Sequence, residues 1–586
     1  MKAVRLFDIP HVQLARFPKA DAIGSKEGGQ WRVYSTQEMI DTAEKIALGL
    51  MALGAKPGDR ISIASGNRSE WCLVDQAILQ IGAINVPLYP TASAEDYAYV
   101  LAHSNAKVCF SSNAEIHAKA VSAQGNSSAL QHLFTFDRLA GARHWSELLE
   151  LGAGQDKTVL AGYRAQVKRD DMATIIYTSG TTGKPKGVML THGNILSNIE
   201  GSTERLPVDH TATSISFLPL SHIYERMLMY LYMHTGVSIR FQETLDDLGD
   251  RIREVQPEVF TAVPRLLEKI YDKIVAKGEA LTGVKRKLFF WALDLGLRYE
   301  VHGRSPWYNV QLAIARKLIF SKWQAALGGK VKCVASGSAA LQPRLARVFN
   351  AAGVPLMEGY GLTETSPVVS VNCAWNDGLR FGSVGRPIKD VQVRIAEDGE
   401  ILVKGPNVMI GYYNEPELTA QVLDPDGWFH TGDIGVVEDG FLRITDRKKE
   451  IFKTSGGKYV APQVLENKLK ESRFIEQVMV IGENRKFPSA LIVPSFAFLK
   501  DYCALKGIPY TSNEQVIRDE RVIERFKKEV DRVNAGHGHW EQVKKIALMP
   551  TEWSIERGEL TPTMKLRRKE IMSRCAAEVE HIYGAE

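Results

Sequence analysis

Several features that would assign this sequence of 586 residues to a special class are missing from it. The six cysteines are scattered and form no C-x-x-C pair, so neither a disulfide framework nor a zinc site is predicted, and a reducing compartment is favoured. No run of about 18 apolar residues occurs, so no transmembrane helix is predicted. The first ten residues lack the apolar core of a signal peptide. We therefore expect a cytoplasmic protein, with peripheral contact to a membrane left open.

The charge is too weak to indicate a nucleic-acid partner, because the net charge of the whole chain is only +5. Hydrophobic residues make up 45% of the chain and charged residues 24%, which is ordinary for a soluble globular protein. Since the length exceeds what one hydrophobic core supports, we expect two or more domains.

One stretch, Tyr177-Thr-Ser-Gly-Thr-Thr-Gly-Lys-Pro-Lys186-Gly-Val188, combines glycines, hydroxyls and two lysines. It follows an apolar run, Ala173–Tyr177, and precedes another, Val188–Leu190, which we interpret as two short buried strands. Glycines let backbone N–H groups approach an anion, hydroxyls donate hydrogen bonds, and lysines supply charge. This chemistry suits a polyphosphate better than a flexible surface linker, because linkers seldom lie between two buried strands.

The spacing excludes the commonest phosphate-binding loop. A P-loop ending at Gly183-Lys184 would need glycine at 178 and serine or threonine at 185, where the chain has Thr178 and Pro185. The stretch instead resembles the phosphate loop of the adenylate-forming superfamily, which includes acyl-CoA synthetases, luciferases and peptide-synthetase adenylation domains. The motifs that carry this resemblance extend from about Tyr34 to Lys565. It implies that ATP is bound by Thr178, Ser179, Gly180, Thr181, Thr182, Gly183 and Lys186.

Helix and strand signals alternate near the start of the chain. Ser35 and Glu38 can form a capping box, Asp59–Ser65 and Ala83–Leu88 have the pattern of strands, and Glu70–Ile81 that of a helix. This βαβ order predicts a doubly wound, mainly parallel sheet. We expect an α/β protein with a large N-terminal domain of stacked, mainly parallel sheets and flanking helices, a small β subdomain and a small α+β C-terminal lid. The predicted domains are 1–447 and 448–586.

Two further strands end in small or polar residues. Val331–Ala335 leads to Gly337 and Ser338, and Val354–Glu358 leads to a glycine-rich turn. The carboxyl ends of parallel strands are where such folds bind ligands. By the resemblance, Glu364 and the Thr178 hydroxyl hold the Mg²⁺ of MgATP, Tyr360 stacks on adenine and Thr363 contacts the α-phosphate. The remaining nucleotide-binding residues expected here are Gly337, Ser338, Glu358, Gly359 and Gly361.

His222 occupies the histidine of a family motif that lies near the reacting carboxylate, although a lone histidine is more often a structural residue. The segment that follows, Met227–His234, is rich in methionine and aromatic residues. Such residues can line an apolar channel, and core packing is an equal alternative.

The resemblance also assigns roles to residues near the C-terminal end. Asp433 and Arg447 match the ribose contacts, Lys449 matches the pivot of the mobile lid, and Lys453 belongs to a strip used in the thioester-forming orientation. Lys565, in Leu-Thr-Pro-Thr-Met-Lys, matches the lysine that enters the active site. Together with Lys186, Glu364 and His222, it completes the predicted catalytic group. The neighbouring Arg567, Arg568 and Lys569 are interpreted only as charge.

The segment 265–332 has 14 lysines and arginines and 5 aspartates and glutamates, a charge of +9. Two apolar stripes recur there at helical spacing, one from Leu288 to Tyr299 and one from Leu312 to Trp323. Basic amphipathic helices of this kind can lie on anionic membranes or can be ordinary surface helices. An insertion at this place resembles the long-chain members of the superfamily.

We therefore expect a long-chain fatty acid–CoA ligase that uses ATP, Mg²⁺ and coenzyme A, converting the acid first to acyl-AMP and then to the thioester. One alternative keeps adenylation but changes the acid to a medium-chain or aryl acid, or the acceptor to a carrier protein. A second alternative is a fatty-acid-binding protein without catalysis. No nucleic-acid partner is expected.

Overall fold

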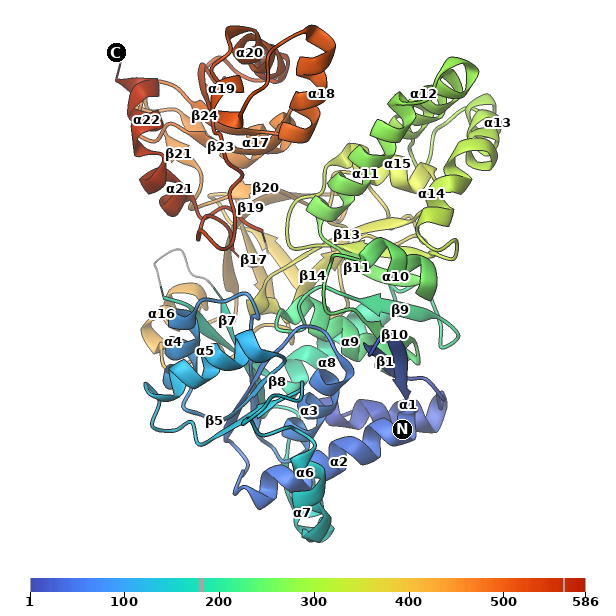
Figure 1. Ribbon diagram of the computed structural model, residues 1–586, viewed down its shortest axis with the longest axis vertical. Coiled ribbons are helices and arrows are strands. Elements are labelled where there is room, and N and C mark those ends of the chain that lie inside the picture. The colour runs from blue at the N-terminus through green and yellow to red at the C-terminus, as the bar shows by residue number, and fades with distance from the viewer. Residues whose placement is uncertain (1, 179–183, 562–563, 585–586) are drawn as a thin grey trace. The chain divides into compact units, whose positions relative to one another are not determined.

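The computed structural model describes residues 2–178, 184–561 and 564–584 (Figure 1). The chain forms two compact units. Unit 1 comprises Met1–Arg394, Leu402–His430 and Gly440–Leu442, and unit 2 comprises Ile395–Ile401, Thr431–Asp439 and Arg443–Glu586. The domain boundary at 447/448 stays a prediction.

Unit 1 contains two large sheets. The first has the strand order β15-β14-β13-β12-β11-β9-β10-β1-β2, and it is parallel from β13 through β1. Its strands are β1 (Ile23–Glu27), β2 (Gln30–Tyr34), β9 (Thr213–Ser216), β10 (Ser238–Phe241), β11 (Val259–Ala262), β12 (Cys333–Ser336), β13 (Leu356–Gly361), β14 (Val368–Val371) and β15 (Arg386–Pro387).

The second sheet has the order β18-β8-β7-β4-β3-β5-β6; its pairs are parallel from β7 through β6, and β8 is antiparallel to both β7 and β18. Its strands are β3 (Arg60–Ala64), β4 (Ile84–Leu88), β5 (Ala106–Ser111), β6 (His132–Thr135), β7 (Met172–Thr178), β8 (Lys186–Thr191) and β18 (Gly411–Tyr412). The expected doubly wound, mainly parallel architecture is confirmed, and so are the strands on either side of the glycine-rich loop.

Side chains alternate along each strand, so the second sheet has an apolar face on each side. Helices cover both of these faces. Ile61 and Ile63 of β3 belong to one core cluster with α3, while Ala64 belongs to another with α4. The helices of unit 1 are α1 (Ile9–Arg16), α2 (Thr36–Ala52), α3 (Ser69–Gln80), α4 (Ala94–His103), α5 (Ala114–Gln124), α6 (Glu147–Leu151), α7 (Lys157–Gln166), α8 (His192–Thr203), α9 (Ile223–Thr235), α10 (Leu248–Val255), α11 (Pro264–Glu279), α12 (Gly283–Leu297), α13 (Pro306–Ala315), α14 (Ser321–Ala326), α15 (Pro343–Ala351) and α16 (Pro416–Val422). Short helical turns are η1 (Leu6–Asp8), η2 (Gly152–Gly154), the π-helical η3 (Arg316–Phe320) and η4 (Thr363–Thr365).

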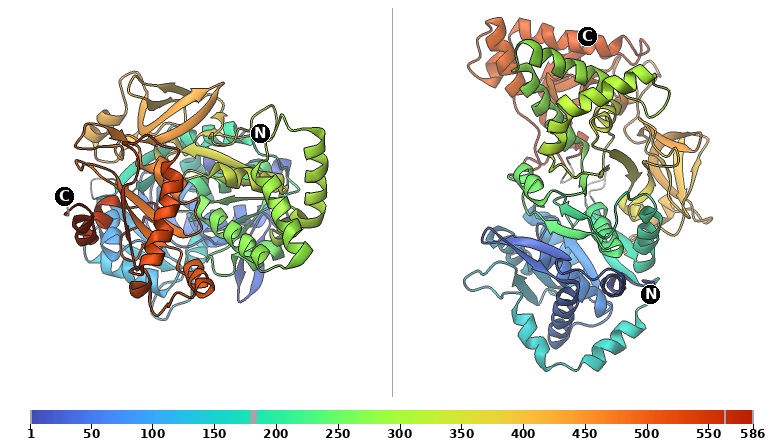
Figure 2. Two further views of the ribbon diagram at one scale, coloured as in Figure 1. Left: turned by 90° about the horizontal axis from the view of Figure 1, so that it is seen from above. Right: turned by 90° about the vertical axis from the view of Figure 1, so that its right-hand side faces the viewer.

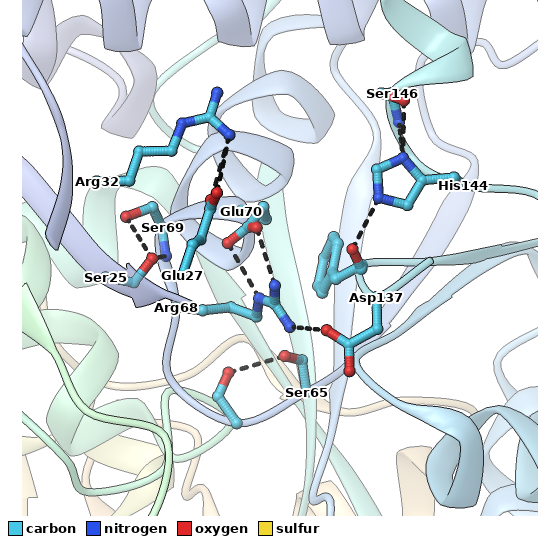
Figure 3. Close-up of polar contacts among 12 residues, drawn as sticks. Ser25, Glu27, Arg32, Ser65, Arg68, Ser69, Glu70, Asp137, His144 and Ser146 are labelled. Carbon is cyan, nitrogen blue, oxygen red and sulfur yellow. Dashed lines mark hydrogen bonds and ion pairs between the residues drawn. The ribbon is translucent and has the colours of Figure 1, made fainter. Parts of the chain in front are cut away.

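Local signals begin several of these helices. The Ser35 side chain accepts a hydrogen bond from the Glu38 N–H, and the Glu38 carboxylate accepts one from the Ser35 N–H, so the predicted capping box forms. Thr191 caps α8 in the same way through Asn194. Arg68, just before α3, pairs with both Glu70 and Asp137 (Figure 3). Side-chain contacts therefore fix the starts of α2, α8 and α3.

The small sheet β16-β17-β19-β20 contributes residues to both units. Its strands are β16 (Gln392–Ile395), β17 (Glu400–Lys404), β19 (Phe429–Glu438) and β20 (Phe441–Arg447). A hairpin around Asp398-Gly399 joins β16 and β17, and Gly399 has a φ of +84°, which favours glycine. This is the expected small β subdomain.

The remainder of unit 2 is a small α+β fold, with strand order β23-β24-β25 and helices packed on it. Its elements are β21 (Phe452–Lys453), β22 (Tyr459–Val460), α17 (Pro462–Leu469), β23 (Ile475–Ile481), β24 (Ser489–Pro494), α18 (Phe496–Lys506), α19 (Asn513–Val516), α20 (Glu520–Asn534), β25 (Lys545–Leu548), α21 (Arg568–Arg574) and α22 (Ala576–Tyr583). The expectation of an α+β C-terminal part is confirmed.

The segment Met227–His234 lies in α9, and its methionine and aromatic side chains are buried in the core of unit 1. Of the two interpretations offered for it, core packing is the one that the structure supports. The stripe from Leu312 to Trp323 also faces the core, through Leu312, Ala315 and Trp323. No helix in the described ranges is long and apolar enough to cross a bilayer.

One ion pair lies at the centre of unit 1. Asp75 of α3 and Arg226 of α9 are both fully buried, and an Arg226 Nη atom lies 2.5 Å from Asp75 Oδ1. Arg226 also donates to Thr174 on β7 at 2.8 Å and contacts Tyr230. This cluster connects α3 and α9 to β7, the strand that leads into the glycine-rich loop.

We expect Asp75→Leu or Arg226→Met to lower the free energy of unfolding by about 3–5 kcal/mol, because each leaves one buried charge without its partner. The double variant should be less destabilised than the sum of the two single variants. Urea unfolding followed by tryptophan fluorescence measures this, since the Trp71 ring lies beside Arg226. Simple additivity in the double variant would contradict the pairing.

Candidate functional site

The glycine-rich loop connects two antiparallel strands. β7 ends at Thr178 and β8 begins at Lys186, and these two residues face each other in the ladder. The two ends of the loop are therefore held side by side. Of the predicted phosphate-binding residues, Ser179, Gly180, Thr181, Thr182 and Gly183 lie outside the described residues.

A tyrosine connects the lysine of this hairpin to the predicted metal-binding glutamate. The Lys186 Nζ atom lies 5.3 Å from the centroid of the Tyr412 ring, and the Tyr412 hydroxyl donates a hydrogen bond of 2.9 Å to Glu364 Oε1. Tyr412 is buried and belongs to β18, which pairs with β8. Burial and the nearby Glu364 carboxylate raise the pKa of Tyr412, so its hydroxyl keeps its proton and remains a donor.

The turn that carries Glu364 is fixed by amide side chains. Asn198 of α8 donates to the Thr365 and Val368 carbonyls at 3.2 and 2.8 Å, and Asn407 donates to the same two atoms at 3.0 and 3.3 Å. The Met409 N–H donates to the Glu364 carbonyl at 2.9 Å. Thr363 is buried beside a half-buried Glu364, so the carboxylate is held in place while remaining accessible.

The other predicted residues of unit 1 follow the carboxyl ends of parallel strands. Gly337 and Ser338 follow β12, while Glu358, Gly359, Tyr360 and Gly361 end β13. The Glu358 carboxylate accepts a hydrogen bond from the Leu341 N–H at 2.9 Å, and burial raises its pKa to about 8. A Cβ at position 361 would lie 1.7 Å from the Pro367 carbonyl oxygen, so this position requires glycine.

His222 begins α9, and its Nδ1 atom accepts a hydrogen bond from the Tyr224 N–H at 3.1 Å. A Cβ at Gly337 would lie 3.3 Å from the Tyr224 ring, so the start of α9 lies against the loop after β12. The sequence analysis missed Glu225. Its buried carboxyl group accepts a hydrogen bond from the Thr261 hydroxyl near the end of β11, and burial raises the pKa of Glu225 to about 7. His222 is thus placed by a capping bond at the carboxyl edge of the first sheet.

A second group of predicted residues lies in unit 2. Arg447 Nε lies 3.4 Å from Asp433 Oδ1, so the two predicted ribose contacts are adjacent, with Asp433 almost completely buried. The Asp433 N–H also bonds the Thr431 hydroxyl at 3.1 Å. Lys449 is exposed just after β20, and Lys453 is exposed on β21, where its Nζ lies 5.4 Å from the Tyr459 ring.

Lys565 is half-buried, and its backbone is hydrogen-bonded to Thr561. The Thr561 N–H donates to the Lys565 carbonyl at 2.8 Å, and the Lys565 N–H donates to the Thr561 hydroxyl at 3.0 Å. Arg568, interpreted from sequence only as charge, is instead an ion-pair centre: it contacts Glu450 at 3.1 Å and Glu466 at 2.5 Å. The segment bearing Lys565 is therefore attached to residues that directly follow Lys449.

The donor set is suitable for a phosphate-bound magnesium ion. The Tyr412 hydroxyl engages one oxygen of the Glu364 carboxylate and leaves the other for a ligand. Mg²⁺ needs only one or two protein oxygens when phosphates and water complete its shell. Within the described ranges no cluster of three or more His, Cys, Asp or Glu side chains could hold a metal, so an ion at Glu364 would depend on phosphate oxygens.

Comparison with known proteins gives matches along almost the whole chain. The family described as AMP-binding enzyme matches residues 11–413, and its C-terminal domain family matches residues 449–586. The chain is 36% identical over 567 residues to the long-chain-fatty-acid–CoA ligase FadD15 of Mycobacterium tuberculosis, covering 95% of this chain and 93% of that protein. It is 33% identical over 606 residues to human long-chain-fatty-acid–CoA ligase 1, covering 96% and 84%.

Solved structures share the fold at lower identity. The anthranilate CoA ligase AuaEII in complex with anthranoyl-AMP matches with a TM-score of 0.74 and 18% identity, covering 99% of both chains. The A domain of a carboxylic acid reductase from Segniliparus rugosus, in complex with AMP and a carboxylic acid, matches with a TM-score of 0.74 and 22% identity, covering 100% of this chain and 95% of that one.

We expect Tyr412→Phe to slow the reaction at this site roughly tenfold to a hundredfold, because a hydrogen bond to a charged group contributes about 1.5–3 kcal/mol. The ring beside Lys186 is kept, so only the bond to Glu364 is removed. Steady-state rates at increasing Mg²⁺ concentration should show a raised requirement for the metal. The neighbouring Tyr413→Phe is the matched control, and equal losses in both variants would contradict the role of this hydroxyl.

The raised pKa of Glu358 predicts a stability change with pH. Because its pKa rises from 4.5 to about 8 on folding, the folded state binds more protons than the unfolded state between these values, and stability falls as the pH rises through this interval. Glu358→Gln should therefore make the thermal unfolding midpoint depend less on pH between 5 and 8. The exposed Glu95→Gln should leave the wild-type dependence unchanged, and an unchanged slope in Glu358→Gln would refute the prediction.

Proposed function

Since the chain belongs to the AMP-binding enzyme family, we propose that it is a long-chain fatty acid–CoA ligase that forms an acyl-AMP from ATP and then an acyl-CoA. The observation that carries this proposal is the similarity, over nearly the full length of both chains, to ligases of that name. The arrangement of Lys186, Tyr412 and Glu364 supports it, because it joins a cation and a carboxylate at the base of a glycine-rich loop.

In the proposed first step, a carboxylate oxygen of the fatty acid attacks the α-phosphorus of ATP, and the bond to pyrophosphate breaks. Both reactants are anions, so the site must position them and neutralise charge rather than supply a nucleophile. We assign this to Lys186, to the backbone and hydroxyls of the loop after Thr178, and to Lys565. Mg²⁺ held by Glu364 and the Thr178 hydroxyl would neutralise phosphate charge.

Further residues would orient the nucleotide. Tyr360 would stack on the adenine, Thr363 would contact the α-phosphate, and the Asp433 carboxylate would accept hydrogen bonds from the ribose hydroxyls. The Arg447 guanidinium beside Asp433 orients that carboxylate. His222, placed at the carboxyl edge of the sheet by its capping bond, would lie by the reacting carboxylate.

In the proposed second step, the thiolate of coenzyme A attacks the acyl carbonyl, and AMP leaves with the electrons of the acyl–phosphate bond. The thiol must approach where Lys565 acted, so we propose that the C-terminal part rotates about Lys449 and brings the strip around Lys453 to the site. Exposed Lys449, which lies within the charged run Asp446–Glu450, is suited to this role.

We also propose a cytoplasmic location with peripheral contact to a membrane, because the proposed substrate partitions into bilayers.

The assay that tests the function measures AMP release from ATP with a ladder of fatty acids, with and without coenzyme A. Trapping the acyl-AMP with hydroxylamine separates adenylation from thioester formation. If AMP release is highest with medium-chain or aryl acids, or if it requires a carrier protein, the alternative ligases are favoured. If the protein binds fatty acid without ATP and releases no AMP, the non-catalytic binding protein is favoured.

We expect Lys565→Ala to reduce acid-dependent pyrophosphate release by roughly 10²–10³-fold, as removal of one transition-state donor does elsewhere. The variant should still convert supplied acyl-AMP and coenzyme A to the thioester, because Lys565 acts only in the first step. Exposed Lys569→Ala is the control for a change of charge in the same segment. An equal fall in both half-reactions would show that the two-orientation mechanism is wrong.

A further inference from the structure

The outer face of α13 and η3 is apolar although it is not part of the core. Trp307, Val310, Ile314 and Leu318 have exposed fractions of 67%, 49%, 45% and 48%. They follow one another at intervals of three or four residues, so they lie on one side of the helix. We call these four residues the outer stripe. The opposite side of the helix is buried through Tyr308, Leu312, Ala315 and Phe320.

Folding does not require the outer stripe, because the inner side already attaches the helix to unit 1. Both Figure 1 and Figure 2 show α13 beside α12, away from the strands of the first sheet. The inner side belongs to the same core cluster as α12 and α15. An exposed apolar strip on the solvent side of such a helix is typical of a surface that contacts a protein or a membrane.

In the stretch of sequence that contains the outer stripe, all the charged residues are basic. No aspartate or glutamate occurs between Glu300 and Glu358, whereas Arg304, Arg316, Lys317 and Lys322 are exposed within or next to α13 and η3. Among the described residues, no ion pair engages Lys317 or Lys322. An apolar strip surrounded by unpaired basic side chains is complementary to a surface that is apolar inside and anionic outside.

From these observations we propose that the outer stripe of α13 and η3 docks on the surface of an anionic lipid bilayer. The stripe from Trp307 to Leu318 is roughly 16 Å long at 1.5 Å per residue, so the helix would lie in the plane of the interface. The aliphatic side chains would enter the acyl boundary, and the indole of Trp307 would lie at the headgroup level. The lysines and Arg304 would contact lipid phosphates.

The charge pattern favours a bilayer over a second copy of this chain. Two copies meeting through this face would bring Lys317, Lys322 and Arg304 of one molecule close to those of the other, and like charges repel. This proposal extends the proposed function, because a ligase at the bilayer surface would take its acid from the membrane. The binding itself does not depend on catalysis.

The test is flotation of the full-length protein with vesicles of phosphatidylcholine alone or mixed with phosphatidylglycerol. We expect binding to the anionic vesicles, and weakening by salt because the lipid headgroups and lysines are screened. Trp307→Ser with Ile314→Ser should lower the partition coefficient at least tenfold, and Lys317→Glu with Lys322→Glu should remove the preference for anionic lipid. The charge variant keeps the test valid if the first one fails to fold.

Matched controls change similar side chains elsewhere in unit 1. Val121→Ser with Val159→Ser removes two exposed valines, and Lys45→Glu with Lys389→Glu reverses two exposed lysines. Both controls should bind vesicles as the wild type does. Failure of the wild type to float with anionic vesicles, or equal losses in the controls, would overturn the proposal. The proposal would also be overturned if the wild type self-associates and binds no vesicle, and if Trp307→Ser with Ile314→Ser makes it monomeric.

A separate readout distinguishes this proposal from the ligase function. AMP release with a detergent-solubilised fatty acid should be unchanged in all four double variants, because none of the altered residues belongs to the proposed site. Vesicle binding without AMP release from any acid would refute the ligase function and leave the docking face standing.

Discussion

The hydrogen bond from Tyr412 to Glu364 joins the two sheets of unit 1 at the place where the site must form. Tyr412 extends the second sheet through its pairing with β8, whereas Glu364 follows β13 of the first sheet. Lys186 lies against the same tyrosine ring, so the end of the phosphate loop and the carboxylate share one support. Lys186 and Glu364 belong to separate sheets, and this contact joins their side chains, while Asn198, Asn407 and the Met409 N–H hold the backbone of the Glu364 turn.

The parts of the site that depend on neighbours in sequence could be predicted. The strands around the glycine-rich loop, the cap at Thr191 and the hairpin at Asp398-Gly399 all have local signals. Tyr412 could not be found in this way, because β18 has only two residues and pairs with a strand more than two hundred residues earlier in the chain. Glu225 was hidden for a similar reason, since it lies on α9 and its partner Thr261 lies on β11.

Periodicity identified the apolar stripes of the basic segment but could not say which side of the helix meets the core. The stripe from Leu312 to Trp323 is the inner one, and the exposed Ile314 and Leu318 lie between its members in sequence. Arg568 shows the same limit for charge. It lies in a run of basic residues that looks solvated, yet it forms ion pairs with Glu450 and Glu466, two acids more than a hundred residues away in sequence.

These ion pairs are compatible with the proposed role of Lys449 as a pivot. Before it, Lys448 binds Asp398 and Glu400 at 2.6 and 2.8 Å, and after it, Arg568 binds Glu450 and Glu466. Neither group of contacts crosses Lys449, so the proposed rotation would preserve both. An ion pair that does cross Lys449 joins Arg447 to Glu450 at 3.8 Å between partly exposed side chains, and it is therefore weak. Asp446 is buried, and burial raises its pKa to about 7. The nearby Glu450 and Glu466 contribute to this rise in pKa. The proposed rotation would move these two acids away from Asp446.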